Sequence, residues 1–166
     1  MAQPGLRPYL ASDAAALAAL FRASIEALAA EDYDADQREA WASAADDEAA
    51  FAARLAGALT IVALADGEIA GFASLKDNKL FDMLYVRPDY AGQGVGAALA
   101  DAIEKLAGAR GTKTLTVEAS DTARDFFAAR GYVAQSRNTV TIAGEWLGNT
   151  TMTKQLAAPP AAGGTH

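Results

Sequence analysis

Three glycines alternate with other residues in the segment Gly92-Gln93-Gly94-Val95-Gly96, directly before a stretch rich in Ala and Leu. Glycine has no Cβ atom, so the backbone can turn tightly and approach a ligand closely. If the stretch that follows is a helix, its first N–H groups lack an acceptor and lie at the positive end of the helix dipole. The segment therefore predicts a binding site for an anion such as a pyrophosphate.

Two other interpretations fit the same glycines. One is a plain tight turn. The other is the fingerprint of a dinucleotide-binding domain, with Gly92, Gly94 and Ala97 as its small residues and Glu118 as the ribose acceptor. In that fingerprint the first glycine lies near the end of a strand, whereas here residues 87–91 intervene and a predicted hairpin comes before. A nicotinamide-dependent reductase is therefore the weaker interpretation, and a Walker loop is excluded because no Gly-Lys-Ser/Thr follows.

Residues that commonly transfer protons or bind metals are scarce. The chain has no cysteine, and its only histidine is the last residue, His166. A general base must then be Asp, Glu, Tyr or Lys, or a water held by one of them, and we expect no metal. The net charge of −7 argues against partners such as nucleic acid or anionic lipid, and it favours a cationic substrate such as an amine.

The periodicity of apolar residues indicates the elements that position this loop. Strands are expected at residues 7–10, 60–64, 68–75, 80–86, 114–118, 132–142 and 145–154, and helices at 13–30, 34–43, 46–56, 95–110 and 123–130. The pairs Asp66-Gly67 and Ala143-Gly144 are expected to form hairpin turns.

This order predicts an α+β fold with a mixed, mostly antiparallel central sheet of about seven strands flanked by helices. We expect one domain over residues 1–156 and a disordered tail over 157–166, which holds two prolines and two glycines. No apolar stretch suits a signal peptide or a membrane span, so the expected location is the cytoplasm.

With the elements in place, the loop resembles the glycine loop of the GNAT N-acetyltransferase superfamily, written Arg/Gln-x-x-Gly-x-Gly/Ala. Ala91 stands at its first position, where the family usually has Arg or Gln. The segment Phe126-Phe127-Ala128-Ala129-Arg130-Gly131-Tyr132 is similar to the family's second motif, aromatic-x-x-x-Gly-aromatic. The resemblance covers residues 7–156, and the substrates of the bacterial subgroup that it suggests are poorly defined.

The resemblance implies that acetyl-CoA binds between the fourth and fifth strands, which splay apart in this superfamily. The residues that it implies for the cofactor are Leu84, Val86, Ala91, Gly92, Gln93, Gly94, Val95, Gly96, Ala97, Ser120, Ala123, Phe126 and Phe127.

Asp82 is the expected catalytic residue, because the family commonly places an acidic residue in the fourth strand, where it works through a water. The simpler interpretation is that Asp82 pairs with a neighbouring Lys or Arg. Phe127 replaces the Tyr that the family often uses as the general acid. Water, Tyr85 and Ser120 are open as substitutes for that acid.

Substrate contacts are expected from Tyr33, Gln37 and Trp41, which recur every four residues and would share one helix face. Core packing is the competing interpretation for the two aromatic residues. The predicted function is transfer of an acetyl group from acetyl-CoA to a primary amine of a small or amino-acid-like acceptor, by direct attack. The alternative is a non-catalytic CoA-binding or regulatory module on the same fold. Trp146 would lie either in the cleft or at the edge of a homodimer.

Overall fold

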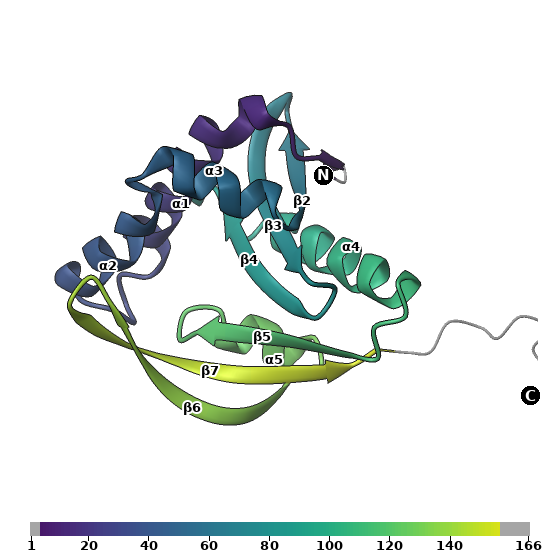
Figure 1. The fold of residues 1–166 in the computed structure, drawn as a ribbon. Coiled ribbons are helices and arrows are strands. Elements are labelled where there is room, and N and C mark those ends of the chain that lie inside the picture. The colour runs from purple at the N-terminus through teal and green to yellow at the C-terminus, as the bar shows by residue number, and fades with distance from the viewer. Residues whose placement is uncertain (1–3, 157–166) are drawn as a thin grey trace, which may run out of the picture.

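A computed structural model describes residues 4–156 of the chain, which build one seven-stranded sheet in the order β1-β2-β3-β4-β5-β7-β6 (Figure 1). The strands are β1 (Gly5–Pro8), β2 (Leu59–Ala65), β3 (Glu68–Lys76), β4 (Leu80–Val86), β5 (Thr114–Ser120), β6 (Val133–Ile142) and β7 (Glu145–Gln155). The α-helices are α1 (Ala14–Leu28), α2 (Ala35–Ala42), α3 (Glu48–Ala56), α4 (Val95–Ala109) and α5 (Arg124–Ala129). The predicted tail at 157–166 lies outside the described residues.

The sheet is mixed and mostly antiparallel, which confirms the predicted fold class. Only β4 and β5 run parallel, and every other neighbouring pair is antiparallel. The two-residue turns are also as predicted: Asp66 and Gly67 have φ of 54° and 77°, and Ala143 and Gly144 have φ of 46° and 83°. Positive φ at both positions matches the right-handed twist of the flanking strands.

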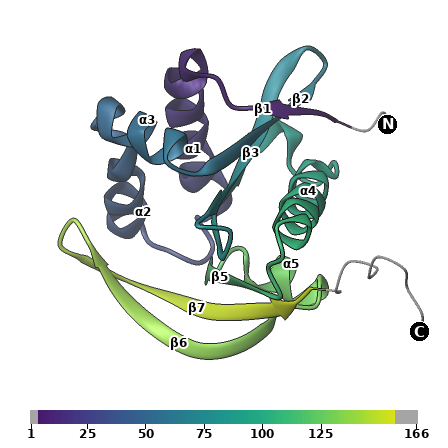
Figure 2. The ribbon, with the colours of Figure 1, turned by 45° about the vertical axis from the view of Figure 1, so that its right-hand side comes forward.

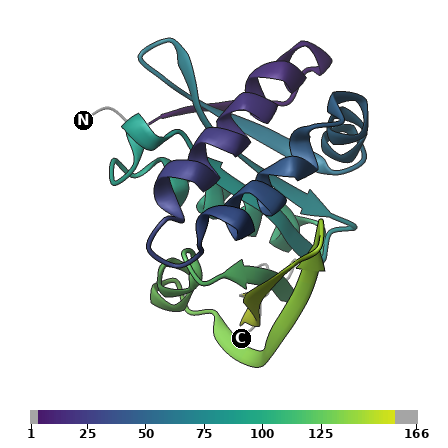
Figure 3. The same cartoon turned by 90° about the vertical axis from the view of Figure 1, so that its left-hand side faces the viewer.

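The helices lie in two layers, one on each face of the sheet. Helices α1, α2 and α3 cover one face, and α4 and α5 lie on the other (Figures 2 and 3). The first layer encloses a core that includes Phe21, Phe51 and Phe72. The second encloses a core that includes Leu99 and Ile103. Within residues 4–156, no helix is both long and apolar enough to span a bilayer.

The N-terminal boundaries differ from the sequence prediction. The first strand ends at Pro8, because residues 11–13 form a short 3-10 helix before α1 begins at Ala14. The Asp13 carboxylate accepts a hydrogen bond from the Leu10 N–H (2.8 Å) and pairs with Arg7 at 2.7 and 2.9 Å. Asp13 therefore fixes the turn between strand and helix, and its side chain accepts no hydrogen bond from the first turn of α1.

A bulge in β4 decides where its side chains point. Leu75 of β3 pairs with Phe81 and Ser74 pairs with Met83, so Asp82 is an extra residue on β4. Phe81 consequently packs in the α4 layer, whereas Met83, two residues on, packs in the α1 layer.

Strands β4 and β5 diverge directly after this bulge. They pair only through Leu80 with Thr116 and Phe81 with Val117. Beyond those pairs, β5 turns away with β7 and β6, while β4 stays with β3 (Figure 1). The divergence opens the sheet at its centre.

Candidate active site

A cavity of about 600 Å³ lies where β4 and β5 diverge. Its walls come from α1, α2, β4, the glycine loop, the start of α4, the end of β5 and α5. One continuous cavity thus joins the glycine loop to the centre of the sheet.

The glycine loop has the geometry of an anion site. Gly92 and Gly94 have φ of 75° and 85°, a backbone conformation that favours glycine. Gly94 is the N-cap of α4, and the first main-chain hydrogen bond into the helix runs from the Ala98 N–H to the Gly94 carbonyl (3.0 Å). The N–H groups of Val95 to Ala97 therefore have no acceptor within the helix, and they lie at the positive end of its dipole.

Most residues predicted for the cofactor line this cavity. They are Leu84, Val86, Ala91, Gly92, Gly94, Val95, Gly96, Ala97, Ser120, Ala123, Phe126 and Phe127. Gln93 does not line it, because its side-chain amide turns back to the Asp89 carbonyl (3.1 Å). Phe127 is 2% exposed, and its ring packs edge-on against Phe81 and Tyr132.

Asp82 also lines the cavity, and it forms an ion pair. Its two oxygens accept hydrogen bonds from Nε (3.1 Å) and Nη2 (3.3 Å) of Arg54 on α3. The side chain of Asp82 is 14% exposed and that of Arg54 is 44% exposed. The pairing with a neighbouring Arg, which was the simpler interpretation of the sequence, is present, and Asp82 is also among the residues that line the cavity.

Tyr85 and Trp41 form an aromatic wall of the same cavity. The Trp41 N–H donates to the Tyr85 hydroxyl (3.2 Å), and the two rings stand edge to face. Burial raises the pKa of Tyr85 to about 12, so its hydroxyl stays protonated at neutral pH. That hydroxyl has no acceptor for its own proton within residues 4–156.

Tyr33 and Gln37 do not line the cavity, unlike Trp41. Helix α2 begins at Ala35, so the prediction that Tyr33 shares a helix face with the other two is wrong. The physical reason is the capping box at the helix start, in which Asp34 and Gln37 exchange hydrogen bonds of 2.8 and 2.9 Å. The Gln37 amide also donates to the Trp146 carbonyl (2.8 Å).

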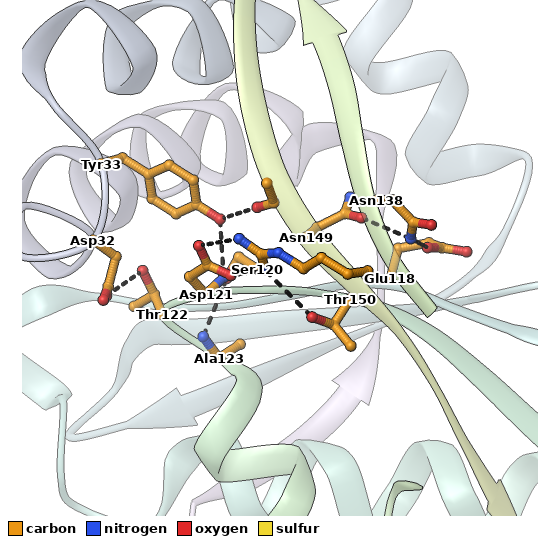
Figure 4. Close-up of polar contacts among 12 residues, drawn as sticks. Asp32, Tyr33, Glu118, Ser120, Asp121, Thr122, Ala123, Asn138, Asn149 and Thr150 are labelled. Atoms are coloured by element: carbon orange, nitrogen blue, oxygen red, sulfur yellow. Dashed lines mark hydrogen bonds and ion pairs between the residues drawn. The ribbon is translucent and has the colours of Figure 1, made fainter. Parts of the chain in front are cut away.

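Tyr33 joins three segments that are far apart in the sequence (Figure 4). Its hydroxyl donates to the Gly148 carbonyl on β7 (2.6 Å) and accepts from the Asp121 N–H after β5 (2.9 Å). The Asp121 carboxylate pairs with Arg137 of β6. Tyr33 is 4% exposed and does not line the cavity. It therefore supports the end of β5, which does line the cavity, from the outside.

Part of the cavity lining was not predicted from the sequence. These residues are Ser24, Ile25, Leu28, Ala29, Phe81, Tyr90, Val117, Glu118, Ala119 and Thr122. Ser24, Ile25 and Leu28 on α1 and Ala29 at its C-cap were predicted only as part of a helix, and Glu118 was considered only as a ribose acceptor. Leu115, Val117 and Ala119 of β5 are buried. The alternation of side chains along a strand could therefore have indicated that Glu118 points to the other face of the sheet. No group of three or more His, Cys, Asp or Glu side chains suited to a metal occurs in the part of the chain that the structure describes.

Comparisons with known proteins agree with this geometry. A family model described as "Acetyltransferase (GNAT) domain" matches residues 29–156. YafP of Escherichia coli (strain K12), described as an uncharacterized N-acetyltransferase, is 32% identical over 144 residues, which cover 87% of this chain and 91% of YafP.

Solved structures show the same architecture. A Rhodopseudomonas palustris protein described as "GCN5-Related N-acetyltransferase: Aminotransferase, Class-II" is 65% identical, with a TM-score of 0.93 over 94% of this chain and 98% of that one. The PaiA N-acetyltransferase of Thermoplasma acidophilum, solved in complex with coenzyme A, shares the fold at 20% identity, with a TM-score of 0.76 over 93% of this chain and 99% of that one.

The diverging parallel strands and the glycine loop at a helix N-terminus define an acyl-CoA N-acyltransferase fold. With the family model matching most of its length, the chain belongs to the GNAT acetyltransferase family.

Proposed function

We propose that this chain is an acetyl-CoA-dependent N-acetyltransferase that acts on a primary amine of a small acceptor by direct attack. The observation that supports the proposal is one cavity that is lined by both the glycine loop and Asp82. The cavity thereby connects the anion site at the glycine loop with Asp82, the candidate proton acceptor. The coenzyme A bound to PaiA, which has the same fold, supports the choice of cofactor.

The glycine loop and the first turn of α4 are assigned the pyrophosphate of the cofactor. Their free N–H groups offer hydrogen bonds, and the helix dipole favours the negative charge. Gly96 lies between the side chains of Val86 and Phe126. A Cβ atom at this position would be in van der Waals contact with both, at 3.7 Å. The edge of β4 after Phe81 has no strand beside it on the β5 side, so its backbone groups are free for an extended ligand.

In the proposed reaction, the amine nitrogen bonds to the thioester carbonyl carbon, the carbon–sulfur bond breaks, and the amine loses one proton. An aliphatic amine with a pKa of about 10 is almost wholly protonated at neutral pH, so a base must act first. We assign this role to Asp82, through a water molecule. Arg54 holds the Asp82 carboxylate in one orientation from the side of α3.

The departing thiolate does not depend on a Tyr at position 127. A thiol with a pKa near ~8.5 costs on the order of 2 kcal/mol to release as the anion at pH 7. The thiolate can instead take its proton from solvent, because burial raises the pKa of Tyr85 to about 12 and makes its hydroxyl a weaker acid than the thiol.

The alternative function is binding of CoA without catalysis. Phe127 favours this non-catalytic alternative, because its ring is buried beside Phe81 and Tyr132 and has no proton to donate to a leaving group.

Thiol release from acetyl-CoA over a broad panel of primary amines tests the proposal. Asp82→Asn removes the basic group but keeps its shape, and kcat/KM should fall by roughly two to four powers of ten with little change in acetyl-CoA affinity. Arg54→Gln is the matched control, because it breaks the same ion pair and leaves the carboxylate. It should lower kcat/KM by less than about tenfold.

Equal losses in both variants would show that the ion pair, and not the basicity of Asp82, matters. Tight binding of acetyl-CoA with no thiol release from any amine would favour the non-catalytic alternative.

A further inference from the structure

The charge on the cavity wall is unevenly compensated. Two acidic residues, Asp82 and Glu118, line the cavity, and no Lys, Arg or His is among its lining residues. Arg54 reaches Asp82 from behind and neutralises it. Glu118 has no ion-pair partner within residues 4–156. Glu118 is therefore the uncompensated negative charge of the cavity.

Glu118 is held in position by neutral groups. One carboxylate oxygen, Oε2, accepts hydrogen bonds from the Thr151 hydroxyl (2.7 Å) and, more weakly, from the Asn138 amide (3.4 Å). The other oxygen, Oε1, has no donor in the described part of the chain. Neutral donors orient the side chain without cancelling its charge, so Oε1 can bind a cation.

The position of Glu118 on β5 turns it toward the helices on the α1 side. Leu115, Val117 and Ala119 are buried in the α4 layer, so the residues between them face the other way. On that side the cavity is bounded by Trp41 and Tyr85. Aromatic rings together with a carboxylate are the groups that recognise an ammonium ion.

The bound cation cannot be the nitrogen that reacts. A carboxylate that holds the reacting nitrogen as an ammonium would oppose the loss of its proton. Asp82 lies on the neighbouring strand, one residue past the last β4–β5 pair, as does Glu118 on its own strand. The two carboxylates can thus serve two nitrogens of one acceptor.

We propose that Glu118, together with Trp41 and Tyr85, binds a second cationic nitrogen of the acceptor, which makes diamines or similar dications the preferred substrate class. This inference rests on the proposed acetyltransferase function for its catalytic part. Binding of a cation at the site can be measured without catalysis.

The test without catalysis compares choline with its uncharged isostere 3,3-dimethylbutan-1-ol, by calorimetric titration in saturating CoA and by competition where binding is weak. Choline should bind roughly threefold to thirtyfold more tightly to the parent protein. Glu118→Gln keeps an oxygen for Thr151 and should remove this preference. Glu145→Gln, outside the cavity lining on β7, should keep it.

Equal binding of the two probes to the parent protein, or a preference that survives in Glu118→Gln, overturns the inference. The parent protein alone gives a second measurement, because the preference for choline should shrink as salt rises from 50 to 500 mM.

The kinetic test compares α,ω-diamines with n-alkylamines of the same chain length. The diamines should have the lower KM in the parent protein, and Glu118→Gln should raise KM for diamines with a smaller change in kcat. A chain that acetylates monoamines and diamines equally would refute the second-nitrogen site while leaving the acetyltransferase proposal intact. If no amine reacts, the acetyltransferase proposal fails and the choline titration still decides on the cation site.

Discussion

Gly94 allows the most direct test of the proposed cofactor site. It is the N-cap of α4, has φ of 85°, and has no atom within 4 Å of where a Cβ would lie. Gly94→Asp places a negative charge where the pyrophosphate would bind, so we expect calorimetric titration with acetyl-CoA to show no binding. The folded state itself should survive, because an acidic group is favourable at a helix N-terminus.

Gly111 offers a closely matched control at the other end of the same helix. Its φ is 88°, and a Cβ there also meets nothing within 4 Å. Gly111→Asp therefore introduces the same charge under the same backbone strain, about 1 kcal/mol or more, and should bind acetyl-CoA like the parent. Loss of acetyl-CoA binding in both variants would show that the loss comes from destabilisation of the fold. Binding by both variants would show that the glycine loop is only a turn.

Most of the residues that line the cavity near the glycine loop were predictable from the sequence, whereas the ion-pair partner of Asp82 was not. Glycines at alternate positions before an apolar helix carry a local signature, and the cavity does include Gly92, Gly94 and Gly96. The partner of Asp82 comes from α3, 28 residues earlier in the chain. Nothing local to Asp82 indicates which cation will reach it, because the tertiary packing of α3 decides that.

At the scale of elements, Tyr33 holds the loop before α2 against β7 and the end of β5. Tyr33→Phe removes one hydroxyl and leaves the Gly148 carbonyl and the Asp121 N–H without that partner. We expect a loss of about 1–3 kcal/mol in the free energy of unfolding. Each kcal/mol should lower the melting temperature by about 2–4 °C for a chain of this size.

Tyr9→Phe is the control for this prediction. The Tyr9 hydroxyl makes no hydrogen bond to any residue from 4 to 156, so the same chemical change should shift stability by about 0.5 kcal/mol or less. Similar melting temperatures for the two variants would show that the Tyr33 hydroxyl does not stabilise the junction.

Element types were predictable from periodicity, but two local irregularities were not. The bulge at Asp82 arises from pairing with β3, and the sequence of β4 reads as an unbroken strand. The start of α2 was placed at residue 34, near the observed Ala35, yet Tyr33 falls just outside it. Tyr33 lies before both the predicted and the observed start of this helix, so only the four-residue spacing had grouped it with Gln37 and Trp41.

At the scale of the whole molecule, buried tyrosines make stability depend on alkaline pH. Burial raises the pKa of Tyr85 from 10 to about 12, and burial next to Glu104 also raises the pKa of Tyr132. Between pH 10 and 12 the unfolded chain has therefore lost protons that the folded chain retains, so stability falls as pH rises. Below pH 10 both states are protonated, and these groups cause no change.

Tyr85→Phe should reduce this alkaline loss. Denaturant unfolding at pH 8 to 11.5 should show a shallower decline for Tyr85→Phe than for the parent, with the remaining decline including the contribution of Tyr132. Parallel curves for the two proteins would mean that Tyr85 ionises alike in the folded and unfolded chains.

The divergence of β4 and β5 gives the sheet two internal edges in addition to its outer ones. An open strand edge exposes a row of unpaired backbone groups, which is a template for association with another chain. Here those edges lie between the α1 layer and the α4 layer (Figure 2). The two helix layers leave no space for a strand that belongs to another sheet to pair with them. The fold therefore leaves the gap between β4 and β5 accessible to a thin extended molecule, and it protects the two strand edges from pairing with another copy of the chain.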